Sequence, residues 1–394
     1  MATVSFLAAR AAPSGQFFIA LAGGASLART SARDGARAGY GASLAAMLQT
    51  VAIMGPARVN APLTQALTAP LLGALHRRGV GVPLQIVACF AIRMVHYAAI
   101  TAALIWIILG GLDAYAGSYD AITGWLGFLP EGERGALIVT ALVNTGWAVF
   151  FSVTQVLLYR RALHRWPAQG EEGAHRNHEE GGPERGSERF DPRAITLAAA
   201  LAFGLLLSGT AWPVLGGVAA WLALAWAVSR PDPEAVPLGL ALTGLVTFGA
   251  LAGSLIAGLG IEEALSRGTR AALLVLVATW LRAAAGPAGL RETFRRILHR
   301  IRRLPAVREA SAVLDGLDSG PRLVAAGRAF IDTLTPLPNT PLEIADTVMD
   351  WVAAEAAGFR AGIGAQRARL SAAPRDGLLV VLAVAPVVAL FAPG

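Results

Sequence analysis

The sequence is poor in charge, in cysteine and in lysine. Only 15% of its 394 residues are charged, whereas 55% are hydrophobic, and soluble domains carry roughly 25% charged residues. A soluble globule of this size is excluded, because too few polar groups exist to cover so much apolar surface. The single cysteine, Cys89, lies in an apolar stretch. Disulfides and cysteine-based metal clusters are therefore excluded as well.

Lysine is missing altogether, so all 33 basic residues are arginines, and the net charge is +7. An excess of this kind occurs in nucleic-acid-binding proteins, but here the arginines lie between apolar segments. That distribution is what the positive-inside rule describes for the cytoplasmic loops of membrane proteins. We therefore expect no nucleic-acid partner. We expect a multi-pass protein embedded in the lipid bilayer of the cell membrane, with its arginine-rich loops in the cytoplasm.

Motifs for catalysis are missing too. The sequence has no phosphate-binding glycine loop, no nucleophile elbow and no zinc-protease motif. The pair with metal-ligand spacing, His175 and His178, falls in a charged tract where nothing would fix the two rings. We predict that the protein is not an enzyme, that it binds no cofactor or metal ion, and that any energy it uses comes from another chain or from a gradient.

Long apolar runs predict an all-α, polytopic helical membrane protein, because backbone groups inside lipid must be hydrogen-bonded within the span. Gly209, Thr210 and Pro213 interrupt one uncharged run, which predicts two short helices instead of one. The mainly acidic loop 112–134 is predicted to lie outside the cell. The candidate spans are Met94–Leu112, with Arg93 at its edge, Ala136–Tyr159, Ala194–Ser208, Ala211–Val228, Ala235–Gly260, Ala271–Ala285 and Leu378–Ala392.

A charged, glycine-rich tract at 166–189 divides the chain. It cannot bury enough apolar surface to offset the entropy of ordering, so we predict a flexible cytoplasmic linker. The linker separates an N-terminal membrane domain, residues 1–165, from a second membrane domain, residues 190–394. The second domain is expected to carry cytoplasmic helices at about 287–376.

The segment 290–304, with the sequence LRETFRRILHRIRRL, interrupts the membrane pattern. Its apolar residues recur at helical spacing and arginines occupy the remaining surface. Alone, this pattern favours an interfacial helix on anionic lipid. The alternative is a cytoplasmic helix that presents its apolar stripe to another protein. A long mixed tract follows at 306–376, with a second amphipathic helix at 344–357, and it favours a cytoplasmic region of amphipathic helices.

Four features follow one another in the second domain. They are Asp191-Pro192-Arg193 before the first span, Gly286-Pro287-Ala288-Gly289-Leu290 leading into the basic helix and Pro305, Ala353-Ala354-Glu355-Ala356-Ala357-Gly358-Phe359, and Arg367-Ala368-Arg369-Leu370 before the last span. In this order they resemble the transmembrane T component of energy-coupling factor (ECF) transporters, the modular vitamin and metal-ion importers of the ABC class. The resemblance covers about residues 190–394.

The resemblance implies a coupling subunit that links ATP hydrolysis by partner ABC ATPase subunits to substrate uptake through a membrane S component. In the family, the arginine of each Ala-Arg-Gly box docks into an ATPase groove. Here Ala357 stands where the second box has its arginine, and the first box is recognisable only around Arg328. The ATPase-coupling candidates that the resemblance implies are Arg291, Arg295, Arg296, Arg300, Arg328, Glu355, Gly358 and Arg360.

The first domain allows two interpretations, a diverged T-like repeat or a fused S-like substrate-binding domain. Arg93 and His96 lie one turn apart at the mouth of an apolar span. Ionisable groups at membrane depth are costly and usually serve a pathway or a partner, and the alternative is that both side chains snorkel to the interface. They are the membrane-pathway candidates of an alternative function, an ATPase-independent permease. The third hypothesis is a membrane scaffold that binds a soluble partner.

Overall fold

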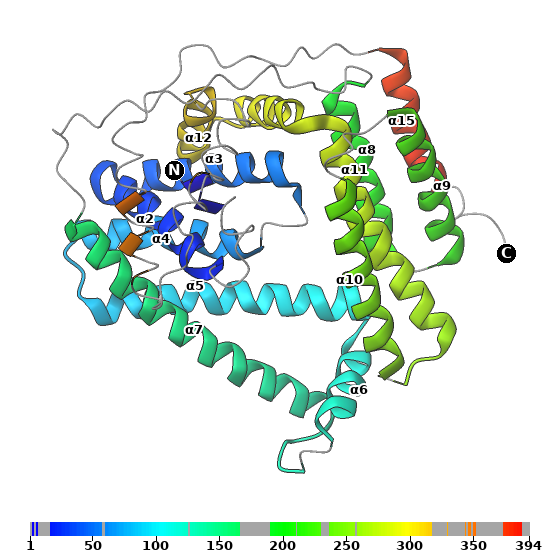
Figure 1. Cartoon of the computed structure of the whole chain (residues 1–394), viewed down its shortest axis with the longest axis horizontal. Helices are drawn as coiled ribbons and strands as arrows, with labels where there is room; N and C mark the ends of the chain where they lie inside the picture. Colours follow the sequence, from blue (N-terminus) through cyan, green and yellow to red (C-terminus); the bar gives the residue numbers. More distant parts are fainter. Residues whose placement is uncertain are drawn as a thin grey trace. The chain divides into compact units, whose positions relative to one another are not determined.

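All regular elements in the described part of the chain are helices (Figure 1). The computed structural model describes residues 2–3, 5–6, 16–56, 60–124, 127–165, 190–209, 211–229, 236–256, 258–316, 329, 343, 346–347, 350–351 and 373–387. The elements are α2 (Gln16–Asp34), α3 (Ala36–Met54), α4 (Asn60–Arg77), α5 (Val82–Ala103), the π-helical segment η2 (Leu104–Leu109), α6 (Leu112–Thr123), α7 (Gly132–Arg165), α8 (Pro192–Ser208), α9 (Trp212–Ser229), α10 (Val236–Ile256), α11 (Ile261–Arg300), α12 (Pro305–Gly316), α15 (Pro374–Val384) and the 3₁₀ turn η4 (Ala385–Val387).

Five of these helical segments are long and apolar enough to cross a membrane. The predicted class, an all-α polytopic membrane protein, is confirmed for the described residues. The predicted break after α8 is confirmed as well, because α8 ends at Ser208 and α9 begins at Trp212. The five segments are Val82–Ile107, Gly132–His164, Trp212–Ser229, Gly239–Ile256 and Ile261–Arg300.

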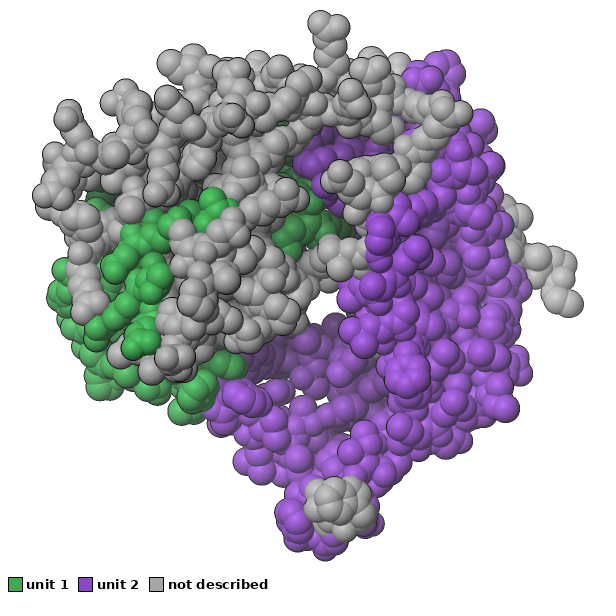
Figure 2. Space-filling model, viewed as in Figure 1, with its two compact units in different colours: residues 1–93, 148–185, 291–368 green, residues 94–147, 186–290, 369–394 purple. Residues whose placement is uncertain are grey.

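The chain forms two compact units, each assembled from separated stretches of sequence (Figure 2). Helices α5, α7 and α11 contribute residues to both units. Each unit also takes segments from both sides of the tract 166–189, so the units do not follow the predicted division into 1–165 and 190–394. The domain labels given from the sequence stay a prediction. Unit 1 is Met1–Arg93, Ala148–Arg185 and Arg291–Ala368, and unit 2 is Met94–Trp147, Gly186–Leu290 and Arg369–Gly394.

Unit 1 contains a tightly packed pair of helices, α2 and α4. A Cβ atom at Gly73 would lie 1.9 Å from the carbonyl oxygen of Ala28, so only glycine permits this approach. Pro70 lies inside α4 and has no N–H for the carbonyl one turn earlier, that of Ala66. Ser43 of α3 donates a hydrogen bond of 2.5 Å to that oxygen. The third helix therefore satisfies the polar group that the proline releases.

In unit 2, the start of α8 is fixed by carboxylates. Asp191 is the N-cap residue, and its side chain accepts a hydrogen bond of 2.8 Å from the backbone N–H of Arg193. The backbone N–H of Asp191 donates in turn to Asp376 of α15 at 2.9 Å. The Asp-Pro-Arg motif thus provides a helix cap, with Pro192 at the first helical position, where its missing N–H has no cost.

The end of α8 is capped by an arginine from α11. Arg270 is buried and donates through Nε to the carbonyl oxygen of Leu206 at 2.6 Å and through Nη2 to that of Leu207 at 3.3 Å. The last carbonyls of a helix have no partner within the helix. A cation at this end also interacts favourably with the helix dipole, so Arg270 stabilises the break that separates α8 from α9.

Candidate functional site

The basic segment predicted from the sequence is the second part of α11. The helix kinks at Gly286, whose φ is 66°, and Pro287 follows. This backbone conformation favours glycine, and proline has no N–H for the helical ladder. Beyond the kink α11 continues to Arg300, and α12 begins at Pro305. The predicted helix end at Leu304 was therefore too late, because a residue before proline disfavours helix.

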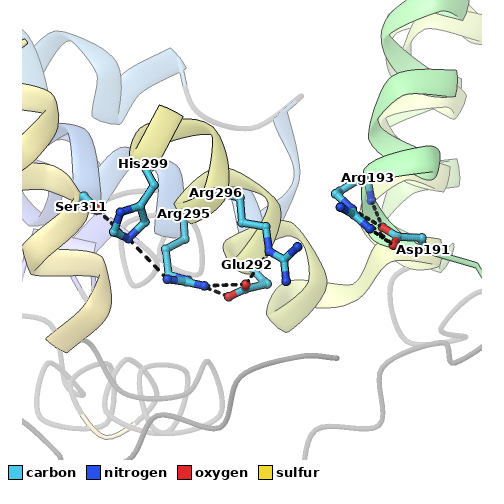
Figure 3. A network of polar contacts seen from close by, with 7 residues as sticks. All are labelled: Asp191, Arg193, Glu292, Arg295, Arg296, His299 and Ser311. Atoms are coloured by element: carbon cyan, nitrogen blue, oxygen red, sulfur yellow. Dashed lines mark hydrogen bonds and ion pairs between the residues drawn. The ribbon is translucent and has the colours of Figure 1, made fainter. Parts of the chain in front are cut away.

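We call residues 291–300 the basic segment. One buried carboxylate, that of Glu292, organises its arginines (Figure 3). Arg295 donates through Nε and Nη2 to the two carboxylate oxygens, each at 2.7 Å. Arg296 donates through Nε to one of them at 3.0 Å. Paired contacts between a guanidinium and a carboxylate are strong and directional, so Arg295 is held against the protein in place of facing a partner.

The inner side of the basic segment is anchored in unit 1. Leu298 packs into a small apolar cluster with Ala45 of α3 and with α12. Ser311 of α12 lies with its hydroxyl 3.1 Å from Nε2 of His299, and Nη1 of Arg295 lies 3.4 Å from the same nitrogen (Figure 3). A guanidinium can only donate, so Nε2 is the acceptor. Apolar packing and these polar contacts together fix the orientation of the segment.

The outer side of the segment and the following turn combine apolar and basic side chains. Ile297, Ile301 and Leu304 are 45%, 49% and 61% exposed, and Arg300 is exposed between them. We call these four residues the exposed face. Exposed apolar residues grouped in this way are typical of surfaces that bind a protein or a membrane.

The ATPase-coupling candidates differ from one another in how exposed they are. Arg300 belongs to the exposed face, Arg296 is exposed while paired with Glu292, and Arg291 and Arg295 are partly buried. The other four candidates, Arg328, Glu355, Gly358 and Arg360, lie outside the described residues, as do Arg367 and Arg369.

Asp346 and Trp351, which stand shortly before Glu355 in the sequence, both make contacts with distant parts of the chain. Asp346 forms an ion pair of 2.9 Å with Arg161 of α7, and Trp351 packs against the apolar core of unit 1. Both contacts are within unit 1. The sequence did not reveal them, because their partners are far away along the chain.

Arg93 is the second candidate, and its predicted position was wrong. Because α5 begins at Val82 and the candidate span runs to Ile107, Arg93 lies inside the span and not at its edge. Its side chain is only 2% exposed, which also rules out snorkelling to the interface. Nη2 donates to Oε1 of Gln155 at 2.6 Å, and the guanidinium lies 5.8 Å from the centroid of the Phe151 ring.

Neutral polar side chains of α4 and α7 continue the hydrogen-bond network around Arg93. Gln155 donates through Nε2 to Oε1 of Gln65 and to Oγ1 of Thr68, both at 2.8 Å. Tyr159 donates to the same oxygen of Gln65 at 3.1 Å. All four side chains are buried. We call Arg93 and these four residues the Arg93 cluster, which belongs entirely to unit 1.

His96, the other pathway candidate, is also buried on α5. Its ring lies 6.0 Å from that of Tyr97, and both residues belong to unit 2. A role of His96 in a pathway stays a prediction.

Two functional groupings were missed from the sequence. Glu292 could have been found, because it stands three and four residues before the arginines that it binds. Gln155 and Gln65 gave no signal, since they are neutral and lie 90 residues apart.

Among the described residues, no group of three His, Cys, Asp or Glu side chains is arranged to hold a metal ion. His175 and His178 lie outside them.

Comparison of the chain with protein-family models, with curated proteins and with solved structures found no significant match in any of the three.

Proposed function

We propose that the protein is the transmembrane coupling subunit of an ECF-type ABC importer. It would link ATP hydrolysis by partner ATPase subunits to uptake of a vitamin or metal ion bound by a membrane S component. The observation that carries the proposal is α11 itself. One helix contains a segment apolar enough to span a membrane, a kink at Gly286, and a basic segment next to an exposed apolar and basic face.

The proposed mechanism needs a rigid basic segment. Glu292 binds both Arg295 and Arg296, and Leu298 anchors the segment to α3 and α12. A force applied at Arg300 would therefore move the basic segment as one body. Packed elements of this kind move between discrete arrangements instead of deforming continuously.

The chemistry of the exposed face suits an acidic groove with an apolar floor on an ATPase. Arg300 offers a planar, permanently charged donor group for a carboxylate, and Ile297 and Ile301 supply apolar area beside it. By the positive-inside rule, the excess of arginine favours the cytoplasmic side for this face, which is the side where ATP is hydrolysed. Around the end of the predicted amphipathic helix 344–357, Glu355, Gly358 and Arg360 would add contacts to the ATPase. Arg328, in the first Ala-Arg-Gly box, would do the same.

The test is co-purification of ABC ATPase subunits with the full-length chain from its native membrane. Two substitutions, Arg300→Glu and Ile301→Glu, each place a negative charge on the exposed face. Each is expected to reduce ATPase recovery by about tenfold or more, the effect of losing one interface hot spot. Arg78→Glu is the matched control, because Arg78 is also an exposed arginine of unit 1. It should leave recovery unchanged.

Recovery of no ABC ATPase with the unaltered chain would overturn the coupling function and favour the permease or the scaffold. Unchanged recovery after Arg300→Glu and Ile301→Glu would show that the exposed face lies on lipid. Arg295 is not a suitable test position, because its substitution would break the contact with Glu292 and disturb the segment itself.

A further inference from the structure

The Nε and Nη2 atoms of an arginine form one edge of the guanidinium, which matches the two oxygens of a carboxylate. Two arginines of this chain show that edge filled (Figure 3). Arg295 binds both oxygens of Glu292 through Nε and Nη2, each at 2.7 Å. Arg193 binds Asp191 through the same two atoms, at 3.0 Å and 2.7 Å. In both cases the partner is a carboxylate.

Arg93 departs from this pattern although it is more deeply buried. Its Nη2 holds a neutral amide oxygen, that of Gln155, at 2.6 Å. Its Nε is buried and has no hydrogen-bond partner in the described part of the chain. The edge that holds a carboxylate in Arg295 is therefore only half filled in Arg93.

Within the described residues, no carboxylate neutralises the charge of Arg93. Its contacts in the described residues are with Gln155 and with the ring of Phe151, and Gln155 is bonded onward to the neutral Gln65 and Thr68. A buried charge without a counter-ion is strongly unfavourable, and an arginine cannot escape by losing its proton. Ionisable groups at membrane depth are therefore expected to meet a partner.

We propose that the Arg93 cluster is a binding site for a single carboxylate group of a ligand within unit 1. One carboxylate oxygen would accept from Nε, and the other would replace the amide oxygen of Gln155 on Nη2. Gln155 would keep the two hydrogen bonds that its Nε2 donates to Gln65 and Thr68, while its Oε1 would give up Nη2 as a donor. One guanidinium edge matches two oxygens and one charge, which favours a carboxylate over a doubly charged phosphate.

This binding site goes beyond the proposed coupling function and does not depend on it. None of the residues of the Arg93 cluster belongs to the basic segment or to the exposed face. The carboxylate can come from a water-soluble molecule or from a fatty acid of the bilayer, since both present the same group. The experiment has one arm for each source.

The single cysteine supplies the probe. Cys89 is fully buried, lies one turn before Arg93 on α5, and is the only thiol of the chain. A maleimide fluorophore therefore reacts only when unit 1 opens. The full-length chain is placed in nanodiscs of zwitterionic phosphatidylcholine at pH 7 and heated, and the temperature of half-reaction of Cys89 is recorded.

The soluble arm compares sodium acetate with sodium chloride at equal ionic strength. The lipid arm compares oleate with oleyl alcohol, which has the same chain without the carboxylate. We expect acetate or oleate to raise the half-reaction temperature by roughly 3–5 °C at about ten times the dissociation constant. A rise with acetate identifies a soluble ligand, and a rise with oleate alone identifies a lipid carboxylate.

Three variants identify the site. Arg93→Gln should abolish the rise, and Arg78→Gln, the exposed control, should retain it. Gln155→Glu places a carboxylate on the edge from within, so it should remove the response to ligand. The proposal is overturned if neither carboxylate acts on the unaltered chain or if the response persists in Gln155→Glu.

Discussion

Unit 1 contains two buried charged clusters with opposite composition. In the basic segment, one anion, Glu292, which is 5% exposed, is surrounded by the cations Arg295 and Arg296. In the Arg93 cluster, one cation that is 2% exposed is surrounded by neutral amide and hydroxyl groups. The central charge of each cluster belongs to a helix that is apolar enough to span a membrane, Glu292 to α11 and Arg93 to α5. They differ in whether the charge is compensated.

That difference separates a structural role from a binding role. The Glu292 cluster is compensated, because both carboxylate oxygens accept from a guanidinium, and it serves to orient the segment. The Arg93 cluster is incomplete, because its Nε has no partner among the described residues. Removal of the central charge should therefore have opposite effects on stability in the two clusters.

The largest effect is expected from Glu292→Gln. The amide cannot bind Arg295 through two charge-assisted contacts, and Arg295, whose side chain is only 19% exposed, would lose its counter-ion. Unit 1 should be destabilised by roughly 2–3 kcal/mol, measured as a lower temperature for the reaction of Cys89 with a maleimide. Arg296→Gln is the control and should cost less, because its side chain is 44% exposed and screened by solvent. Equal effects of the two variants would contradict this account.

Arg93→Met should act in the opposite direction in buffer free of carboxylates. The substitution removes a buried charge that has no counter-ion among the described residues, and it keeps an unbranched side chain. We expect the stability to be unchanged or raised by about 1–2 kcal/mol, with the half-reaction temperature of Cys89 as the measurement. A loss as large as that of Glu292→Gln would show that Arg93 is a structural residue.

The two clusters also differ in how far the sequence predicts them. Long apolar runs gave the membrane class and most helices, and the spacing of Glu292 from its arginines contains the information for their pairing. The position of Arg93 was predicted wrongly. Its charge suggested that it lies at the edge of a span, whereas α5 begins at Val82. Its partner Gln155 lies 62 residues away and carries no charge. Only tertiary packing brings the two together.

Ser311→Ala tests the periphery of the Glu292 cluster and should have a smaller effect. The hydroxyl of Ser311 is buried and lies 3.1 Å from Nε2 of His299, but that nitrogen keeps a contact with Arg295. Because no acceptor is left unsatisfied, the loss should be about 0.5 kcal/mol, the lower end for a neutral hydrogen bond. The temperature of half-reaction of Cys89 with a maleimide measures this loss of stability. A loss comparable to that of Glu292→Gln would mean that His299 and not Glu292 is the centre of the cluster.

His76, a partly buried residue at the end of α4, gives the smallest effect. Burial first, and then the charges of Arg160 and His164, lower the pKa of His76 below its ordinary value of 6.5. The unfolded chain therefore takes up a proton at His76 before the folded chain does, so stability falls as the pH drops below about 6.5. His76→Gln should remove this part of the acid sensitivity, measured by circular dichroism on heating at pH 7.5 and pH 5.5. Equal acid sensitivity of both chains would contradict it.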